Sequence, residues 1–216
     1  MQDLILAGSS GCMRELVWQI QELNKITPTW NIAGYVDYLQ PEDGIGVDVG
    51  NEKILYLGTD ETLLEMTENI NVAICVGMSS LRKKIAQKFM QNPNIHFPNI
   101  ILSNTYVCED AQIGQGCIIS MDSRISTNVR LGDFVFLNTG SMICHDGMIG
   151  DFVTLSPDVK LAGAVKVASG CELGIGSKVI QGISICENVI VGAGAVVIRD
   201  VEEAGTVVGV PARKIK

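Results

Sequence analysis

The C-terminal half of the sequence carries an aliphatic residue at every sixth position. This series runs from Val107 to Val197 without an insertion. A second series, which lies two residues before each later position, runs from Ala111 to Ala195 and holds small or β-branched residues. An amphipathic α-helix repeats its apolar face about every 3.6 residues and cannot keep a period of six. The spacing therefore predicts short strands joined by turns.

Three such six-residue units are expected to close one triangular coil of 18 residues, with each unit supplying one strand and one turn. Glycine, asparagine and aspartate gather at the expected turns, in "LGDF", "IGDF", "CENV" and "VGAG". These residue types suit tight turns and positive φ angles. We therefore predict an all-β parallel β-helix over residues 106–216, whereas an ordinary β-sandwich would show irregular loop lengths.

Residues 1–105 follow a different pattern, in which apolar runs alternate with amphipathic ones. Strands are expected at 4–8, 31–37 and 71–77, and helices at 11–24, 61–69 and 79–92. The acidic, glycine-containing stretch 38–53 is expected to be a mobile loop. Strands that alternate with helices favour a small parallel α/β sheet.

Composition and charge narrow the range of partners. The net charge of −8 and the pI of about 4.7 disfavour nucleic acid, which requires a basic surface. We find no apolar run of about 18 residues and no secretory leader, so we expect a cytoplasmic protein without a membrane span. The seven cysteines include no CxxC pair, so neither a disulfide framework nor a zinc site is expected.

The turn "AGSSG" after the first expected strand places free backbone N–H groups at a helix N-terminus, a setting that suits a phosphate group. The full GxGxxG spacing of a dinucleotide site is absent. Asp37 either accepts hydrogen bonds from ribose hydroxyls or caps a turn. Ligands of open α/β sheets bind where the parallel strands end. The candidate substrate-binding residues at that edge are Ser10, Gly11, Cys12, Asp37, Tyr38 and Gly77.

His145 and Asp146 interrupt the six-residue repeat, and His145 is one of only two histidines in the chain. Imidazole titrates near neutral pH and is the usual general base. A carboxylate bonded to one ring nitrogen fixes the tautomer and favours the imidazolium. An isolated pair of this kind is more often a solvated turn. The sequence around this pair therefore decides how it is interpreted.

Several segments together resemble the NeuD/PglD-type acetyltransferases of bacterial glycan biosynthesis, over nearly the whole chain. They are "LILAGSSG", "YVD", "VGMSSLRKKI", "ICHDGMIGDFVTLSPDVKLAGAVKV", "VGAGAVV" and "GVPARKIK". The resemblance implies an N-terminal Rossmann-like domain and a left-handed β-helix. It implies acetyl-CoA as co-substrate, a sugar-nucleotide amine or a sialic acid hydroxyl as acceptor, and a homotrimer with active sites between neighbouring β-helices. His145 would be the base and Asp146 its acidic partner.

Coil arithmetic adds candidates for the coenzyme site. Gly163 lies one coil after His145 and should stack over it, with an uncovered N–H that holds the thioester carbonyl and then the oxyanion. Ile175 and Ala193 lie one coil apart, along a column that the pantetheine arm can follow, and the resemblance implies coenzyme contacts at both. Thr154 stands where the family often has a second histidine, so the acetyl-CoA contact there must be its hydroxyl or be missing.

We therefore expect an N-acetyltransferase that acts on the amine of a UDP-linked 4-amino-4,6-dideoxy sugar or a similar nucleotide sugar. A sialic acid O-acetyltransferase and a non-catalytic sugar-nucleotide-binding protein remain alternatives. A metal-dependent hydratase on the same scaffold needs three histidine ligands, and the chain has only His96 and His145, so no metal is expected. A nicotinamide oxidoreductase needs a phosphate fingerprint that is missing.

Overall fold

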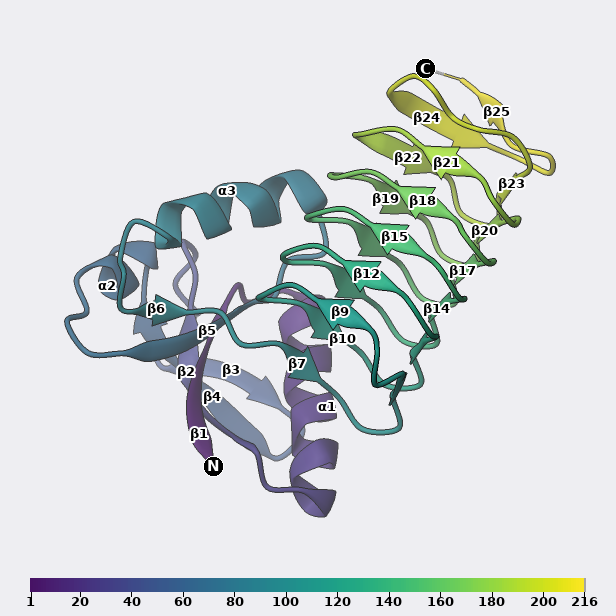
Figure 1. The fold of residues 1–216 in the computed structure, drawn as a ribbon. Helices are drawn as coiled ribbons and strands as arrows, with labels where there is room; N and C mark the ends of the chain where they lie inside the picture. The colour runs from purple at the N-terminus through teal and green to yellow at the C-terminus, as the bar shows by residue number, and fades with distance from the viewer. Residues whose placement is uncertain (216) are drawn as a thin grey trace. The chain divides into compact units, whose positions relative to one another are not determined.

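The computed structural model describes residues 1–215, which form two compact units coloured from purple to yellow along the chain (Figure 1). The first unit comprises Met1–Gly77 and Leu81–Pro98, and the second comprises Met78–Ser80 and the chain from Asn99 onward. The second unit thus starts before residue 106, where we expected it to start. The reason is that β7 (Ile100–Ile101) already pairs with β10 (Ile118–Ile119) as part of the first coil.

The N-terminal unit contains a six-stranded sheet in the order β3-β4-β2-β1-β5-β6. All neighbouring strands are parallel except β3 and β4, which form an antiparallel pair. Buried aliphatic residues fill β1 from Leu4 to Ala7, as expected for a central strand. The elements are β1 (Gln2–Ala7), α1 (Gly11–Ile26), β2 (Trp30–Val36), β3 (Gly46–Val49), β4 (Glu52–Gly58), α2 (Asp60–Leu64), β5 (Ile70–Ile74), α3 (Ser79–Phe89) and β6 (Ile95–His96).

The sequence analysis was wrong about residues 38–53, where the structure forms a hairpin instead of a loop alone. Asp43 accepts hydrogen bonds from the backbone N–H groups of Ile45 and Gly46 and pairs with Lys53 on the opposite strand. These contacts fix the start of β3 against β4. The helix expected at 61–69 is also shorter, because the Asn92 side-chain amide donates to the carbonyls of Leu63 and Met66 and ends α2 there.

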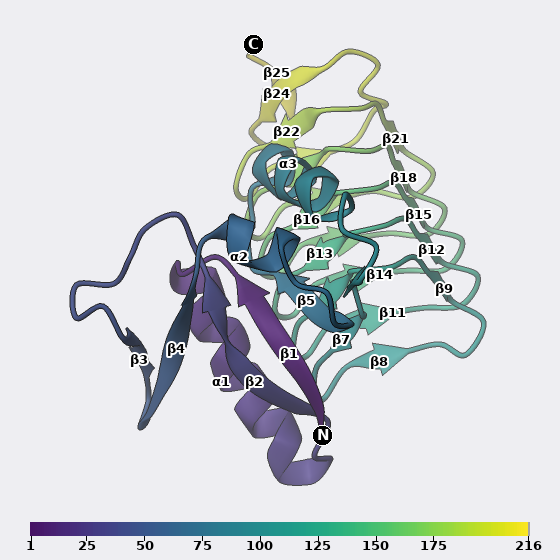
Figure 2. The ribbon, with the colours of Figure 1, turned by 90° about the vertical axis from the view of Figure 1, so that its left-hand side faces the viewer.

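The second unit is a parallel β-solenoid with three faces, in which strands 18 residues apart pair, as Met142 pairs with Lys160. The three faces are called I, II and III, and Figure 2 shows the strands of face III stacked as one ladder. Face I holds β7, β10, β13 (Phe136–Leu137), β16 (Thr154–Leu155), β19 (Glu172–Leu173), β22 (Val189–Val191), β24 (Gly205–Val208) and β25 (Arg213–Lys214). At its C-terminal end, β22 pairs with β24 at an offset of 16 residues, and β25 is antiparallel to β24. Face II holds β8 (Tyr106–Val107), β11 (Arg124–Ile125), β14 (Met142–Ile143), β17 (Lys160–Leu161), β20 (Lys178–Val179) and β23 (Val196–Val197). Face III holds β9 (Gln112–Ile113), β12 (Arg130–Leu131), β15 (Met148–Ile149), β18 (Lys166–Val167) and β21 (Ser184–Ile185).

The two repeating series line the interior of the solenoid, which confirms the predicted coil. Leu137, Leu155 and Leu173 are fully buried, and so are Val135 and Val153 of the small-residue series. At the N-terminal end, Val107 and Ile113 are only partly buried. The solenoid therefore owes its stability to a continuous aliphatic core that each coil extends.

The turns between faces repeat one backbone conformation. At the corner between faces II and III, positive φ angles occur at Asn128 (53°), Asp146 (60°), Ala164 (57°) and Gly182 (76°). The other two corners show the same 18-residue spacing of positive φ. Glycine, asparagine and aspartate tolerate this conformation best, which explains why they gather at the predicted turns.

Among residues 1–215, none of the helices has the length and apolar character that crossing a bilayer requires.

Candidate active site

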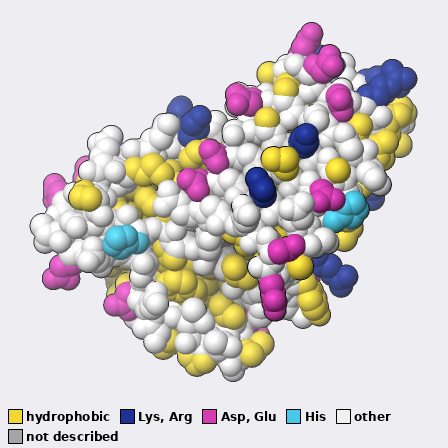
Figure 3. Space-filling model, in the orientation of Figure 1, with side chains coloured by type: hydrophobic (Ala, Val, Ile, Leu, Met, Phe, Trp, Pro, Cys, Tyr) yellow, Lys and Arg dark blue, Asp and Glu magenta, His cyan; other side chains and the backbone are white. Residues whose placement is uncertain are grey.

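His145 and Asp146 occupy the turn between β14 and β15, at the corner between faces II and III. Asp146 supplies the positive φ of this turn, and its N–H donates to the carbonyl of Thr127 in the preceding coil at 3.1 Å. Both side chains are about half exposed, at 52% for His145 and 50% for Asp146. Both histidines of the chain reach the molecular surface (Figure 3).

The two side chains form a hydrogen-bonded dyad. His145 Nδ1 lies 2.8 Å from Asp146 Oδ2. The hydrogen bond from His145, followed by one from Asn128, holds the pKa of Asp146 below its usual value, so Asp146 is a carboxylate at neutral pH. Because a carboxylate only accepts hydrogen bonds, Nδ1 carries the hydrogen, and in the neutral form of the ring Nε2 keeps a lone pair. This is the arrangement that a general base requires.

Gly163 lies directly against the imidazole, as coil arithmetic predicted. A Cβ atom on this glycine would lie 2.4 Å from both Cε1 and Nε2 of His145. The next residue, Ala164, donates its N–H to the carbonyl of His145 at 2.8 Å. Only a residue without a side chain leaves room for the ring in this position.

The backbone N–H of Gly163 donates to no acceptor among residues 1–215. We expected it to lie uncovered, but Gly163 as a whole is buried, because the His145 ring covers it. Among residues 1–215 the donor is therefore unpaired, and the ring shields it.

The other predicted coenzyme contacts lie elsewhere on the solenoid. Ile175 and Ala193 stack one coil apart at the corner between faces I and II, where the N–H of Gly194 donates to the carbonyl of Ile175 at 2.8 Å. Ile175 is 56% exposed. Thr154 begins β16 on face I and is buried. A single solenoid thus brings Gly163 to the dyad but does not bring Thr154, Ile175 or Ala193 there.

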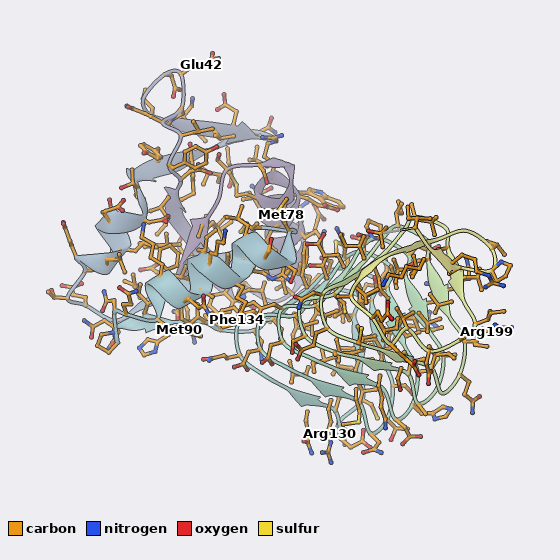
Figure 4. All side chains as sticks on the ribbon, turned by 90° about the horizontal axis from the view of Figure 1, so that it is seen from above. Glu42, Met78, Met90, Arg130, Phe134 and Arg199 are labelled. Carbon is orange, nitrogen blue, oxygen red and sulfur yellow. The ribbon has the colours of Figure 1, made fainter. Side chains whose placement is uncertain are left out.

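A groove of about 630 Å³ runs along face III, on the strands that follow the dyad turn. Met148 of β15 lies in it, and the cations Arg130 and Lys166 lie on the same outward-facing column of strand positions. Arg130 projects away from the coils (Figure 4). Asp200 and Glu202 also line this groove, so it combines apolar side chains with charges of both signs.

A second group of candidate residues lies where β1, β2 and β5 end in the N-terminal unit. Gly8 has a φ of +108°, and the turn after it leads into α1. Within residues 1–215, no acceptor is found for the backbone N–H groups of Ser9, Ser10, Gly11 or Cys12. Unpaired N–H groups at a helix N-terminus attract an anion.

The remaining predicted residues follow the neighbouring strands. Asp37 caps a turn, because its Oδ1 accepts the N–H of Leu39 at 3.0 Å, and this bond leaves Oδ2 for a ligand. Tyr38 is 82% exposed. Gly77 follows β5, and its carbonyl accepts a hydrogen bond from Arg82 at 2.9 Å. Because β2, β1 and β5 are adjacent and parallel, these residues meet at one edge of the sheet.

Two features of this edge were not anticipated. Burial raises the pKa of Cys12 to about 11, with a smaller contribution from Glu15, despite its place at a helix N-terminus. Cys12 is therefore a neutral thiol at neutral pH. Arg82 is almost fully buried and also donates to the carbonyl of Val76 at 2.7 Å. No sequence pattern distinguished it from the neighbouring lysines.

In the described part of the chain, residues 1–215, no three His, Cys, Asp or Glu side chains are grouped so that they can hold a metal ion.

No family model matches the sequence. A serine acetyltransferase from Synechococcus elongatus is 37% identical over 125 residues, which are 53% of this chain and 44% of that enzyme. The chain thus matches less than half the length of this curated relative.

Two solved structures resemble the chain along its whole length. PerB from Caulobacter crescentus, in complex with CoA and GDP-perosamine, is 27% identical with a TM-score of 0.85 and covers 100% of this chain and 98% of its own. The acetyltransferase domain of PglB from Neisseria gonorrhoeae, in complex with acetyl coenzyme A, is 25% identical with a TM-score of 0.86 and covers 99% of each chain. These similarities support an acetyl-CoA-dependent acyltransferase.

The contact between Gly163 and His145 makes a first prediction. In Gly163→Ala, the new Cβ should push the imidazole aside, and kcat/KM should fall about 10²-fold, the cost of a displacement of about 1 Å at a reacting group. The φ of Gly163 is outside the left-handed region and the ring is partly exposed, so the free energy of unfolding should change by less than about 1 kcal/mol. CoA release and thermal unfolding measure the two effects.

The control for this prediction is the same substitution in a His145→Ala background. There it should lower activity no further, since no ring remains to be displaced. An equal loss in both backgrounds would show that Gly163 acts independently of His145.

Proposed function

We propose that the chain is an acetyl-CoA-dependent N-acetyltransferase. It acetylates the amine of a nucleotide-linked 4-amino-4,6-dideoxy sugar in bacterial surface glycan biosynthesis. The observation that carries the proposal is the His145–Asp146 dyad closed against Gly163. The likeness to PerB, which was solved with CoA and GDP-perosamine, supports both the donor and the acceptor class.

In the proposed reaction, the acceptor nitrogen attacks the thioester carbonyl and forms a tetrahedral intermediate. Nε2 of His145 removes one proton from that nitrogen. The C–S bond then breaks, and the CoA sulfur leaves with the proton returned by the imidazolium. Asp146 holds Nδ1–H throughout and stabilises the imidazolium, and the Gly163 N–H is the proposed donor to the oxyanion.

We assign the acceptor's nucleotide to the N-terminal unit, which we propose is a Rossmann-like sugar-nucleotide-binding domain. The unpaired N–H groups from Ser10 to Cys12 suit a diphosphate, while Asp37 Oδ2 suits a ribose hydroxyl and the exposed Tyr38 ring suits a base. Gly77 follows β5 and lies at the same edge of the sheet. Free sialic acid carries a carboxylate but no diphosphate, so this edge favours the sugar nucleotide.

We further propose a left-handed β-helix that assembles as a homotrimer. One solenoid carries the dyad and Gly163 at the corner between faces II and III, whereas the proposed coenzyme contacts Ile175 and Ala193 lie at another corner. Three-fold symmetry sets different corners of neighbouring copies against each other. The coenzyme would then lie between two solenoids, and Thr154 would contact it from face I, away from the dyad corner.

The role of His145 makes a second prediction. His145→Ala should lower kcat by roughly 10²–10⁴-fold with KM for acetyl-CoA nearly unchanged, the usual contribution of general-base catalysis. Asp146→Asn should lower kcat less. The matched control is His96→Ala, because the His96 side chain is exposed and hydrogen-bonds to Asn69 in the N-terminal unit. Full activity of His145→Ala at neutral pH would refute the mechanism.

The acceptor makes a third prediction. Amino-sugar nucleotides, GDP-perosamine among them, and sialic acid are supplied together at equal concentration, and the acetylated products are separated by mass. We expect N-acetylation of a 4-amino sugar nucleotide. Preferential O-acetylation of sialic acid, without protection of residues 8–12 by a nucleoside diphosphate in hydrogen exchange, would favour the alternative acceptor. No turnover with any acceptor would favour a non-catalytic binding protein.

The assembly makes a fourth prediction. Light scattering at micromolar concentration should give three times the chain mass of 23.2 kDa. A shared site also predicts that mixing an inactive His145→Ala variant with an inactive Ala193→Trp variant restores activity, because some mixed trimers contain an intact pair of corners. A monomer mass, or no recovery in mixed trimers, would contradict the shared site.

A further inference from the structure

Asn128 lies one coil before Asp146 at the same corner and contacts the dyad. Its side-chain amide donates from Nδ2 to Oδ1 of Asp146 at 2.7 Å, while the other oxygen of Asp146 faces His145 at 2.8 Å. Each oxygen of the carboxylate therefore has its own partner. With both bonds in place, the carboxylate cannot turn about its terminal torsion without losing one of them.

Asn128 is itself held by the coil before it. Asp110 Oδ2 accepts the backbone N–H of Asn128 at 3.1 Å and the hydroxyl of Thr127 at 2.5 Å. The carbonyl of Thr127 in turn accepts the N–H of Asp146. Three successive coils thus form one hydrogen-bonded column that ends at His145.

We propose that Asn128 is a positioning residue that acts on His145 through Asp146. Its amide fixes the plane of the carboxylate, which keeps Nδ1–H bonded and directs Nε2 along Gly163. The inference rests on the proposed function only in that His145 is the base. Because both members of the dyad are half exposed, water competes for each carboxylate oxygen, and a fixed donor on Oδ1 keeps Oδ2 directed at the ring.

The same type of bond occurs in this chain where no histidine is present. Asn104 has a φ of 59° and donates from Nδ2 to Asp122 Oδ1, one coil on, at another corner. This bond joins two coils and reaches neither member of the dyad. The pair Asn104–Asp122 therefore provides a control that has the geometry of Asn128–Asp146 without its connection to the dyad.

The experiment compares Asn128→Gly with Asn104→Gly in the full-length protein, using GDP-perosamine or the best acceptor and acetyl-CoA. Glycine keeps the positive φ at both positions and removes only the side chain. Asn128→Gly should lower kcat about 10-fold, with KM for acetyl-CoA within about twofold, while Asn104→Gly should leave kcat unchanged. An equal fall in both variants would mean a general effect on the coil and would overturn the inference.

A second variant, Asn128→Asp, keeps the shape and the tolerance for positive φ but cannot donate to Asp146. It should lower kcat at least as much as Asn128→Gly, and it decides the question if the glycine variant folds poorly. Full kcat in Asn128→Asp would show that the hydrogen bond is not needed.

A double-mutant cycle tests the route through Asp146. In an Asp146→Ala background, Asn128→Gly should lower kcat no further, and an additional 10-fold loss would overturn the proposed route. The outcome is separable from that of the proposed function. An active His145→Ala refutes the base, whereas an inactive His145→Ala beside a fully active Asn128→Gly refutes only the role of Asn128.

Discussion

The hydrogen bonds between successive coils are the constraint on which the solenoid depends. They lock each residue beside the ones 18 positions before and after it, as the pairing of Ile143 with Leu161 shows. A chemically active side chain in this fold therefore takes its neighbours from the coils above and below more than from its own turn. The site follows this rule, because Asn128 supports Asp146 from one side and Gly163 admits the His145 ring on the other.

The corners carry a second constraint, since each needs a residue with positive φ. Most corners use glycine, asparagine or aspartate, but Phe134 and Phe152 adopt φ values of 54° and 58° and stack at 5.2 Å. Ring stacking offsets a conformation that is unfavourable for bulky residues. Asp146 meets the corner requirement and also supplies the carboxylate of the dyad. The same backbone demand that places an aspartate at a turn thus places a charge beside the His145 imidazole.

This regularity explains what the sequence could predict. A period of six fixes the interior residues, the corners and the 18-residue columns, so the contact of Gly163 with His145 followed from arithmetic alone. Asn128 lies in the same column as Asp146 and was open to the same reasoning. In contrast, the acidic and glycine residues of 38–53 favoured a loop, whereas the backbone of Gly46–Val49 pairs with the strand that starts at Glu52 and makes a hairpin. Burial of Cys12 and Arg82 likewise arises only from the packed structure.

The exposure of the dyad also connects the coil geometry to the assembly. At half exposure, water and salt screen the attraction between an imidazolium and a carboxylate, so an open corner gives the proposed base little electrostatic support. Excluding water strengthens that attraction. Because the interior of the solenoid is already filled with aliphatic side chains, the water has to be displaced by a surface that packs against the corner from outside. The column from Asp110 to Asp146 can orient the carboxylate, but it cannot remove the water. Orientation is therefore built within one solenoid, whereas in the proposed trimer desolvation would come from the substrates and from a second copy of the chain.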